Sequence, residues 1–265
     1  MVRVAAIQLT LGKGSYRRAM DDAVTSIQRA KKEGAQIACL PEHWLLEYGE
    51  KGYMAVEELA ETAKANRMYL ITGANYTPLE RKDGLRELRI RSTLLGPNGQ
   101  TIGEQDKVHL FKSEKNIASP GELYQTFPTS LGNVGIVVCY DNVFPEAART
   151  LALRGTDLLF VPSRITSEGL DPWMTYLQTR SLENRLPVIA PNVFDPPRYL
   201  GASTIIDLEV NPDNGVARPK VVSAKSGGST VTADVNVELA RELRRVRFRE
   251  RRPDAYQKSE TTHRA

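Results

Sequence analysis

Cysteine and histidine are scarce in this sequence. Its 265 residues include two cysteines, Cys39 and Cys139, and three histidines, His43, His109 and His263. The sequence around each cysteine indicates a role other than a disulfide. No disulfide framework is therefore indicated, and this favours a reducing compartment. The histidines show none of the short spacings that metal ligands need. The sequence therefore predicts neither a metal nor another cofactor.

Long apolar runs are also absent. No stretch approaches the roughly 20 apolar residues of a membrane-spanning helix. Residues 1–9 alternate between apolar and polar side chains up to the Gly-Lys-Gly break at 12–14, which predicts an opening strand rather than a signal peptide. Linkers, internal repeats and long blocks of one charge sign are missing too. We therefore expect a cytoplasmic protein with one domain, residues 1–265, and no membrane segment.

Helix-like and strand-like segments alternate along most of the chain. The patterns predict helices over 16–33, 56–66, 147–154 and 172–183, and strands over 36–40, 69–73, 88–95, 101–106, 135–139, 158–161, 187–190, 203–206, 220–224 and 230–235. Asn98-Gly99 predicts a tight hairpin, and Gly227-Gly228 predicts the turn before the last strand. Asp171 and Pro172 suit a helix N-cap and first helical position. This alternation predicts an α/β fold.

Cys139 stands where a buried strand is expected to end. It closes the apolar run 134–138 and precedes the helix expected from Ala147. A thiol at such a corner lies near amide dipoles that can stabilise a thiolate. A free cysteine is more often a small buried hydrophobe, and Cys39, inside the apolar run 35–40, is assigned to the core.

Two other strand ends carry ionisable side chains. Glu42 follows the run that ends at Leu40, and Lys107 follows the strand that ends at Asp106. A thiol, a carboxylate and an amine are the groups that acyl transfer needs. The carboxylate can accept the thiol proton, and the ammonium can stabilise the oxyanion. Spacing and periodicity do not show that the three groups meet in space.

The motifs around these residues resemble the nitrilase superfamily of carbon–nitrogen hydrolases, over practically the whole chain. The segments that carry the resemblance are Leu40-Pro41-Glu42, Thr93 to Gly99, Lys107 to Phe111, Glu114 with Ser119-Pro120-Gly121, Gly135 to Glu146, Arg180 to Asn184, Tyr199 to Ser203 and Arg252 to Tyr256. The resemblance implies a four-layer α-β-β-α sandwich. It also implies a catalytic triad of Glu42, Lys107 and Cys139, with Glu114 as an additional glutamate that positions substrate. The backbone N–H of Tyr140 would join Lys107 in the oxyanion hole.

Two departures from the family pattern bear on the substrate. Many members have an arginine before the aromatic residue where this chain has Val143-Phe144, so an acid-recognising arginine is not implied there. Nitrile-cleaving members commonly have tryptophan and glutamate after the cysteine, whereas Tyr140 and Asp141 follow Cys139, which resembles the amidase and carbamoylase branch. The resemblance therefore implies hydrolysis of a small amide or N-carbamoyl compound through a cysteine thioester, with release of ammonia or an amine. Nitrile hydrolysis by the same triad is the alternative.

Some residues are candidates for the border of a substrate pocket. Arg164 or Arg198 could pair with a substrate carboxylate, because a guanidinium binds a carboxylate through two parallel hydrogen bonds. Trp173 and Tyr48 could line the pocket or simply pack in the core. The identity of the substrate stays open at this level, because pocket shape decides it.

A different enzyme class is also open. His43 or His109 could be the base in place of Glu42, which would make the protein a Cys-His hydrolase. Cys139 lies between Val138 and Tyr140, without the glycine-rich elbow common at such nucleophiles, and this argues against the alternative.

The C-terminal region raises a third hypothesis, a non-catalytic basic binding protein. Residues 241–252 contain seven arginines, in a chain of net charge +4, which would suit nucleic acid or another acidic partner. Apolar residues at 239, 243, 246 and 248 instead predict a helix with an apolar stripe and a solvated basic face. No nucleic-acid motif accompanies the charge, so we expect no nucleic acid partner. The resemblance implies that this basic helix and polar tail, from about residue 236, serve a homodimer or higher oligomer.

Overall fold

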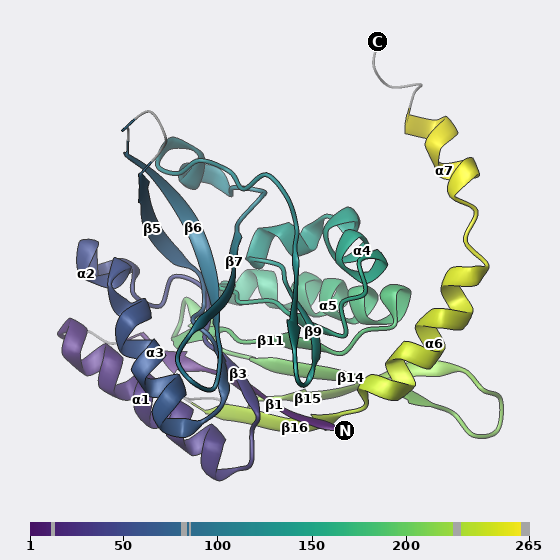
Figure 1. Ribbon diagram of the computed structural model, residues 1–265, viewed down its shortest axis with the longest axis horizontal. Helices are drawn as coiled ribbons and strands as arrows, with labels where there is room; N and C mark the ends of the chain where they lie inside the picture. Colours follow the sequence, from purple (N-terminus) through teal and green to yellow (C-terminus); the bar gives the residue numbers. More distant parts are fainter. Residues whose placement is uncertain (12–13, 81–83, 85, 225–228, 261–265) are drawn as a thin grey trace.

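The computed structural model describes residues 1–11, 14–80, 84, 86–224 and 229–260. Two β-sheets lie face to face, and helices cover the outer surface of each sheet (Figure 1). The chain therefore has four layers in the order α-β-β-α, which confirms the predicted fold class.

The first sheet contains seven of the described strands and carries the N-terminal half of the chain. Its order is β16 (Thr230–Val235), β1 (Val2–Ile7), β3 (Ile37–Cys39), β4 (Tyr69–Ile71), β6 (Arg86–Leu95) and β5 (Asn75–Glu80), and β7 (Thr101–Asp106) also pairs with β6. Helices α1 (Tyr16–Lys32) and α3 (Ala55–Asn66) contact its outer face. The side chain of Ser15 caps α1, which buries Met20, Ala23, Ile27 and Ala30 along one side.

The second sheet contains six of the described strands. Its order is β15 (Ala217–Ser223), β14 (Thr204–Val210), β11 (Val188–Ala190), β10 (Leu158–Phe160), β9 (Gly132–Ile136) and β8 (Thr126–Thr129). Helix α5 (Leu170–Asn184) contacts its outer face, and α4 (Pro145–Leu153) packs beside α5. A small sheet joins β13 (Tyr199–Leu200), β12 (Val193–Asp195) and β2 (Leu9–Thr10). The short remaining helices are α2 (Glu50–Tyr53), η1 (Leu46–Tyr48), η2 (Lys112–Asn116), η3 (Cys139–Val143) and η4 (Ser167–Gly169).

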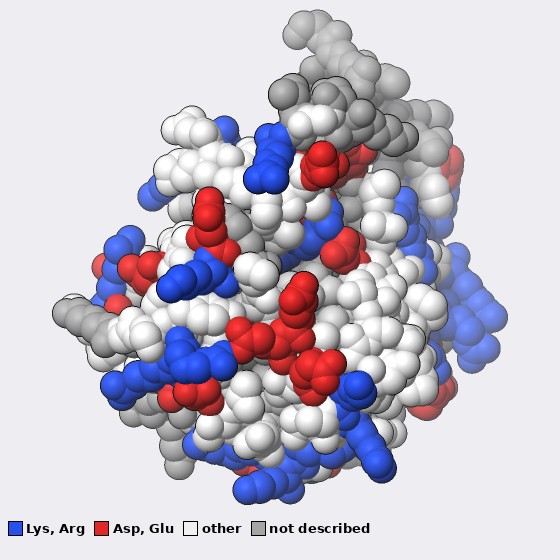
Figure 2. All heavy atoms as spheres, turned by 60° about the vertical axis from the view of Figure 1, so that its left-hand side comes forward, with Lys and Arg blue, Asp and Glu red and all other residues white. Residues whose placement is uncertain are grey.

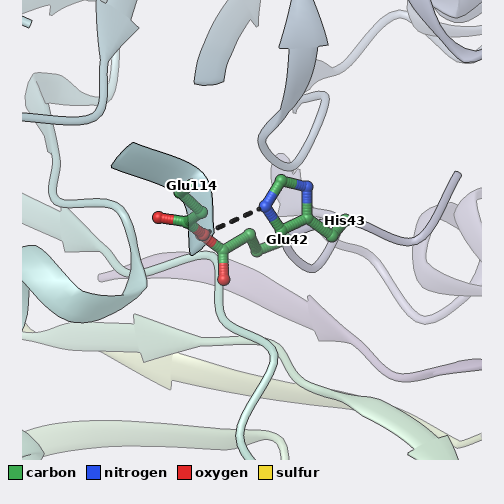
Figure 3. Close-up of side chains that lie close together, drawn as sticks. All are labelled: Glu42, His43 and Glu114. Carbon is green, nitrogen blue, oxygen red and sulfur yellow. Dashed lines mark hydrogen bonds and ion pairs between the residues drawn. The ribbon is translucent and has the colours of Figure 1, made fainter. Parts of the chain in front are cut away.

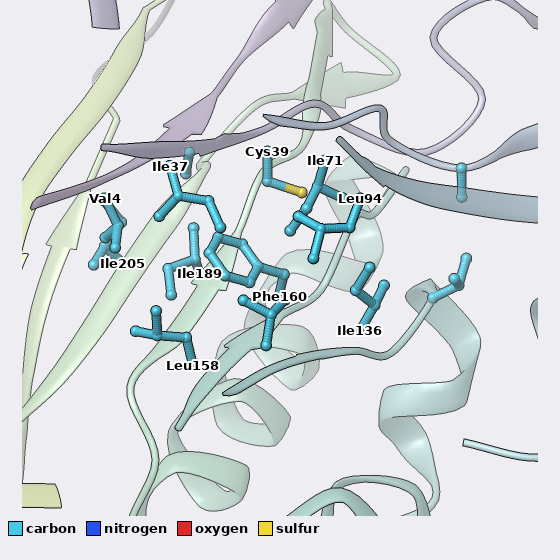
Figure 4. Close-up of a cluster of buried hydrophobic side chains, with 14 of the residues drawn as sticks. Val4, Ile37, Cys39, Ile71, Leu94, Ile136, Leu158, Phe160, Ile189 and Ile205 are labelled. Atoms are coloured by element: carbon cyan, nitrogen blue, oxygen red, sulfur yellow. The ribbon is translucent and has the colours of Figure 1, made fainter. Parts of the chain in front are cut away.

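The main core lies between the two sheets. Figure 4 shows Val4, Ile37, Cys39, Ile71 and Leu94 from the first sheet facing Ile136, Leu158, Phe160, Ile189 and Ile205 from the second. Cys39 is fully buried there, which confirms its assignment to the core. Burial of this apolar surface fixes the two sheets against each other, so groups at their strand ends are held on a rigid support.

Most expected elements are present, with boundaries that differ by a few residues. The Asn98-Gly99 hairpin is confirmed: Gly96 N–H donates to Gln100 O at 2.8 Å, and Gly99 has φ +83°, which favours glycine. Asp171 and Pro172 lie in the first turn of α5, as its second and third residues rather than as the N-cap and first residue, because the helix begins at Leu170 with Gly169 as its N-cap. The predicted turn at Gly227-Gly228 lies outside the described residues.

The strand expected over 135–139 lies earlier in the chain. Strand β9 runs from Gly132 to Ile136, and Cys139 begins the 3₁₀ helix η3. Backbone bonding to the neighbouring segment nevertheless continues: Val137 N–H donates to Phe160 O at 2.9 Å, and Cys139 N–H donates to Pro162 O at 3.0 Å. The apolar run therefore extends past the assigned strand because residues 137 and 138 remain buried and the segment remains hydrogen-bonded to its neighbour.

The basic helix is present as α6 (Val237–Arg249), followed by α7 (Pro253–Glu260), and both extend along one side of the molecule (Figure 1). The predicted apolar stripe is present in part: Leu239, Leu243 and Phe248 are half-buried, whereas Val246 is 54% exposed. The buried positions of α6 are Val237, Ala240 and Arg244. Arg244 Nη2 contacts the buried carboxylate of Asp157 at 3.0 Å.

None of the described helices combines the length and the apolar character that spanning a membrane requires.

Candidate active site

Glu42 lies at the edge where the two sheets meet. It comes after strand β3, and its N–H donates to Ser163 O, in the segment after β10, at 3.2 Å. A backbone bridge to Ala74 holds the other side of the residue. Only 2% of Glu42 is exposed, so its carboxylate needs partners inside the protein.

Lys107 supplies the main partner. It follows strand β7, where its N–H donates to Ile90 O at 2.8 Å and its carbonyl accepts the N–H of Gly121 at 2.7 Å. Its Nζ lies 2.8 Å from Glu42 Oε1 and 2.9 Å from Glu114 Oε1, and the residue is 1% exposed. Burial alone would lower the pKa of Lys107, but the negative charges of Glu42 and Glu114 outweigh it and raise the pKa. The side chain is therefore a buried ammonium.

Glu114, in η2, is the second carboxylate on this ammonium. Its Oε2 accepts the N–H of Phe111 at 2.6 Å, and its Oε1 lies 3.3 Å from Nε2 of His43 (Figure 3). Burial raises the pKa of Glu114, but hydrogen bonds from His43, Lys107 and Phe111, together with the charge of Lys107, bring it down to about 2. Glu114 therefore remains an anion at any ordinary pH.

Cys139 faces the other carboxylate. Its thiol hydrogen-bonds to Glu42, and the backbone N–H of Arg164 points at the sulfur. Burial and the negative charge of Glu42 raise the pKa of the thiol well above its ordinary value, although Lys107 and the N–H of Arg164 oppose them. The strand-to-helix corner therefore does not produce a ready thiolate, as the amide dipoles alone would suggest. The resting group is a thiol with a carboxylate beside it.

The backbone at Cys139 is in an unusual conformation. Its φ is +44°, a left-handed value that costs a non-glycine residue on the order of 1–3 kcal/mol. The bond from Cys139 N–H to Pro162 O and the buried segment before it hold this conformation. Cys139 packs at the edge of the core between the two sheets, with Glu42 beside its thiol.

The structure thus brings together Glu42, Lys107, Cys139 and Glu114, the four residues predicted from the sequence to have catalytic roles. Oε1 of Glu42 accepts a hydrogen bond from the ammonium of Lys107, and the carboxylate also accepts a hydrogen bond from the thiol of Cys139. A base, a nucleophile and a fixed cation therefore adjoin one another, which is the set that acyl transfer requires.

Arg164, one of the residues predicted to bind substrate, has partners within the protein. The guanidinium of Arg164 is already engaged: Nη1 donates to His43 O at 2.9 Å, Nη2 is 3.6 Å from Glu47 Oε1, and the group lies 4.9 Å from the ring of Tyr199. Its main-chain N–H, rather than its charge, meets the thiol. Arg164 therefore contributes to the site mainly through the backbone.

The other candidates lie nearby or in the core. Tyr140 follows the nucleophile, with its ring 4.8 Å from that of Phe111. Trp173 is buried in the apolar cluster under α4 and α5, in agreement with the packing alternative. Tyr48 packs edge-on against Tyr16 at 6.1 Å, and Arg198 is exposed beside Tyr199.

Both described histidines are engaged away from the sulfur. His43 Nε2 faces Glu114, and His109 Nδ1 lies 2.9 Å from Asp141 Oδ1 and 3.1 Å from the hydroxyl of Tyr124. The thiol hydrogen-bonds to Glu42 instead. This arrangement argues against a Cys-His hydrolase.

The cluster also resembles a set of metal ligands. Glu42, His43 and Glu114 each offer a donor atom, and these atoms lie within 4.8 Å of one another. Lys107 Nζ, however, lies within 2.9 Å of oxygens from both glutamates. The ammonium therefore takes the position of the cation, and these residues form an ammonium cage.

Sequence reasoning missed one buried residue at the site, Asp141. It is fully buried, and its carboxylate accepts the N–H groups of Val108, His109 and Val138. Its place two residues after Cys139 was visible, but a charged residue in a polar stretch usually indicates solvent exposure.

Comparisons with known proteins support one family. The profile described as carbon–nitrogen hydrolase matches residues 3–245. A deaminated glutathione amidase of Synechocystis is 32% identical over 211 residues, which covers 71% of this chain and 75% of that protein. The omega-amidase of Homo sapiens is 29% identical over 279 residues, with 96% of each chain covered. Among solved structures, a carbon–nitrogen hydrolase from Helicobacter pylori superimposes with a TM-score of 0.82 at 22% identity, covering 99% of this chain and 98% of that chain.

Proposed function

The chain belongs to the carbon–nitrogen hydrolase family, and from this premise we propose that it hydrolyses the amide bond of a small carboxamide through a thioester on Cys139. The observation that carries the proposal is the contact of Lys107 Nζ with Glu42 at 2.8 Å, together with the hydrogen bond from the Cys139 thiol to the same carboxylate. N-carbamoyl compounds present the same carbonyl and are included in the proposal. The relatives named as amidases support this choice over nitriles.

Acylation is the first half of the reaction. Glu42 accepts the thiol proton as the sulfur of Cys139 attacks the carbonyl carbon, because the raised pKa of the thiol leaves little thiolate without a base. The carbonyl oxygen becomes an oxyanion, which the ammonium of Lys107 and the N–H of Tyr140 stabilise. The carbon–nitrogen bond then breaks, Glu42 returns the proton to the leaving nitrogen, and ammonia or an amine departs.

Deacylation uses the same groups. Water donates a proton to Glu42 and attacks the thioester carbon, and the oxyanion again faces Lys107. The carbon–sulfur bond breaks, the sulfur recovers a proton from Glu42, and the carboxylic acid leaves. Lys107 stays protonated throughout, since its raised pKa holds the charge in place.

This chemistry favours particular surroundings. Cys139 must stay a free thiol, so we extend the proposal to a reducing compartment such as the cytoplasm. On the face shown in Figure 2, acidic and basic side chains are interspersed among the described residues, which supports a small-molecule substrate rather than nucleic acid.

We further propose a homodimer formed through α6. A groove of about 630 Å³ runs between α6 and the β14–β15 hairpin, and the exposed residues Val246 and Val216 lie along it. An apolar groove of this kind is typical of a subunit contact. Light scattering at micromolar concentration tests this, and a monomeric mass would contradict it.

The test of the main proposal is a substrate panel. Primary carboxamides with and without a distal carboxylate, N-carbamoyl amines and nitriles are supplied to the purified protein, and ammonia release is measured. We expect release from at least one amide or carbamoyl compound, with none from the Cys139→Ala variant. Intact-mass spectrometry of the quenched enzyme should show the acyl adduct. Equal turnover by Cys139→Ala, or turnover of nitriles alone, would contradict the proposal.

A further inference from the structure

His43 is fixed by contacts on every side. Its N–H donates to Ala74 O at 2.7 Å, and its carbonyl accepts Nη1 of Arg164 at 2.9 Å. Its ring packs on Tyr76 with centroids 5.0 Å apart, and only 6% of the residue is exposed. The backbone φ of His43 is +51°, a left-handed value. In this conformation the ring points toward Glu114 (Figure 3). The ring therefore cannot turn to another partner without local rearrangement.

The two ring nitrogens of His43 have different surroundings. Nε2 lies 3.3 Å from Glu114 Oε1, whereas Nδ1 is buried and has no hydrogen-bond partner among the described residues. A proton on Nδ1 would be buried without an acceptor, which is costly. The neutral ring therefore carries its proton on Nε2 and donates it to Glu114. His43 is thus a hydrogen-bond donor to one carboxylate.

The hydrogen bond from His43 gives the two glutamates of the ammonium cage different surroundings. Glu114 accepts hydrogen bonds from Lys107, His43 and the N–H of Phe111, so its oxygens are occupied as an anion. Glu42 contacts Lys107 through Oε1 at 2.8 Å and also accepts the hydrogen bond of the Cys139 thiol. Without His43, Glu114 would lose one of the three donors that hold its carboxylate in place on Lys107.

We propose that His43 is a positioning residue that holds the Glu114 carboxylate in place on Lys107 and so keeps the ammonium beside Glu42 and Cys139. This inference rests on the proposed amide hydrolysis. Several charged or titratable groups surround the His43–Glu114 pair. Glu42, Lys107 and Cys139 belong to the site itself, Tyr76 packs on the ring of His43, and Arg164, which is paired with Glu47, contacts the carbonyl of His43. Lys112 and Lys115 lie on η2 together with Glu114. Lys107 is the ammonium among them that contacts Glu114 directly.

Two variants at the same position separate the donor from the ring. His43→Phe keeps the planar ring against Tyr76 but has no N–H. His43→Gln loses the ring but places an amide N–H at about the reach of Nε2. We expect His43→Phe to lower kcat about tenfold, the usual effect of one hydrogen bond to a charged group. His43→Gln should recover most of kcat, a rescue that ring packing alone would not give.

Two further measurements make the inference specific. Carboxyl ¹³C NMR, with the Glu114 signal assigned by its loss in Glu114→Gln, follows the titration of that residue. We expect His43→Phe to raise the pKa of Glu114 by roughly one unit or more and His43→Gln to leave it nearly unchanged. In a Glu114→Gln background, His43→Phe should change kcat much less than in the native background, because the carboxylate that His43 serves is gone.

Several results would overturn the proposal. An unchanged Glu114 titration in His43→Phe would do so, as would an equal loss of kcat in the native and Glu114→Gln backgrounds. Complete loss of acylation in both His43 variants, with their folds intact by circular dichroism, would instead make His43 the base. A native enzyme that turns over no amide would remove the proposed function itself, while the NMR titration would still decide the role of His43.

Discussion

The imidazole Nδ1 of His109 lies 2.9 Å from Oδ1 of Asp141, and this pair joins the two loops that carry Lys107 and Cys139. His109 is two residues after the ammonium, and Asp141 is two residues after the nucleophile. The same carboxylate accepts N–H groups from both loops. One buried side chain therefore ties the loop that carries the nucleophile to the loop that carries the cation.

Asp141→Asn tests that relationship. The N–H groups of Val108, His109 and Val138 now share the two carboxylate oxygens of Asp141. Asparagine would offer them one oxygen, and its NH₂ group would face N–H donors in place of the other. We expect a loss of about 1–3 kcal/mol of unfolding free energy and at least a tenfold fall in kcat. Urea denaturation and steady-state ammonia release measure the two effects. Glu146→Gln, at an exposed acid on α4, is the control; a similar fall there would mean that Asp141 has no special role.

The sequence allowed the α/β class to be predicted for a physical reason, because buried strands give apolar runs and helices give a different periodicity. Glu42 and Cys139 each follow an apolar run, whereas Lys107 follows the largely polar strand Thr101–Asp106, and the roles of the four clustered residues were implied by the resemblance to the family. Which runs pair, and which sheet faces which, depends on contacts between distant residues, and here the resemblance to the family supplied the answer. Asp141 and His43 were not assigned their roles because burial of a polar side chain is decided by its partners, which no local pattern shows.

Glu42→Gln tests the base. Glutamine keeps the shape and can still contact Lys107, but it cannot accept a proton. We expect kcat/KM to fall by about 10²–10⁴, the range typical of general-base removal. The exposed Glu50→Gln variant should retain native activity. If Glu42→Gln stays within a few-fold of the native enzyme, another group must accept the thiol proton.

Lys107→Met tests the ammonium cage through stability as well as activity. The methionine would leave Glu42 and Glu114 buried without their cation, and we expect about 3–5 kcal/mol of destabilisation at neutral pH. The pKa of Glu114 would then rise, because the ammonium would no longer oppose the effect of burial. The destabilisation is therefore fully present above that raised pKa and diminishes as the pH falls through it.

Denaturation of Lys107→Met at neutral and at mildly acidic pH measures this effect. The exposed Lys115→Met variant is the matched control and should unfold like the native protein at both pH values. A destabilisation of Lys107→Met that does not lessen in acid would show that Glu114 does not depend on the ammonium for its charge.

Alkylation of Cys139 by iodoacetamide tests the state of the nucleophile. The raised pKa of the thiol, caused by burial and by Glu42, means that the rate constant should keep rising from neutral to alkaline pH without an early plateau. In Glu42→Gln the neighbouring negative charge is gone while Lys107 remains, so the pKa falls and the midpoint of the rate profile moves to lower pH. Cys39 is fully buried and should not compete, and Cys139→Ala serves to check this. A native profile that is already flat at neutral pH would show a preformed thiolate, and Glu42 would then be needed only for the later proton transfers.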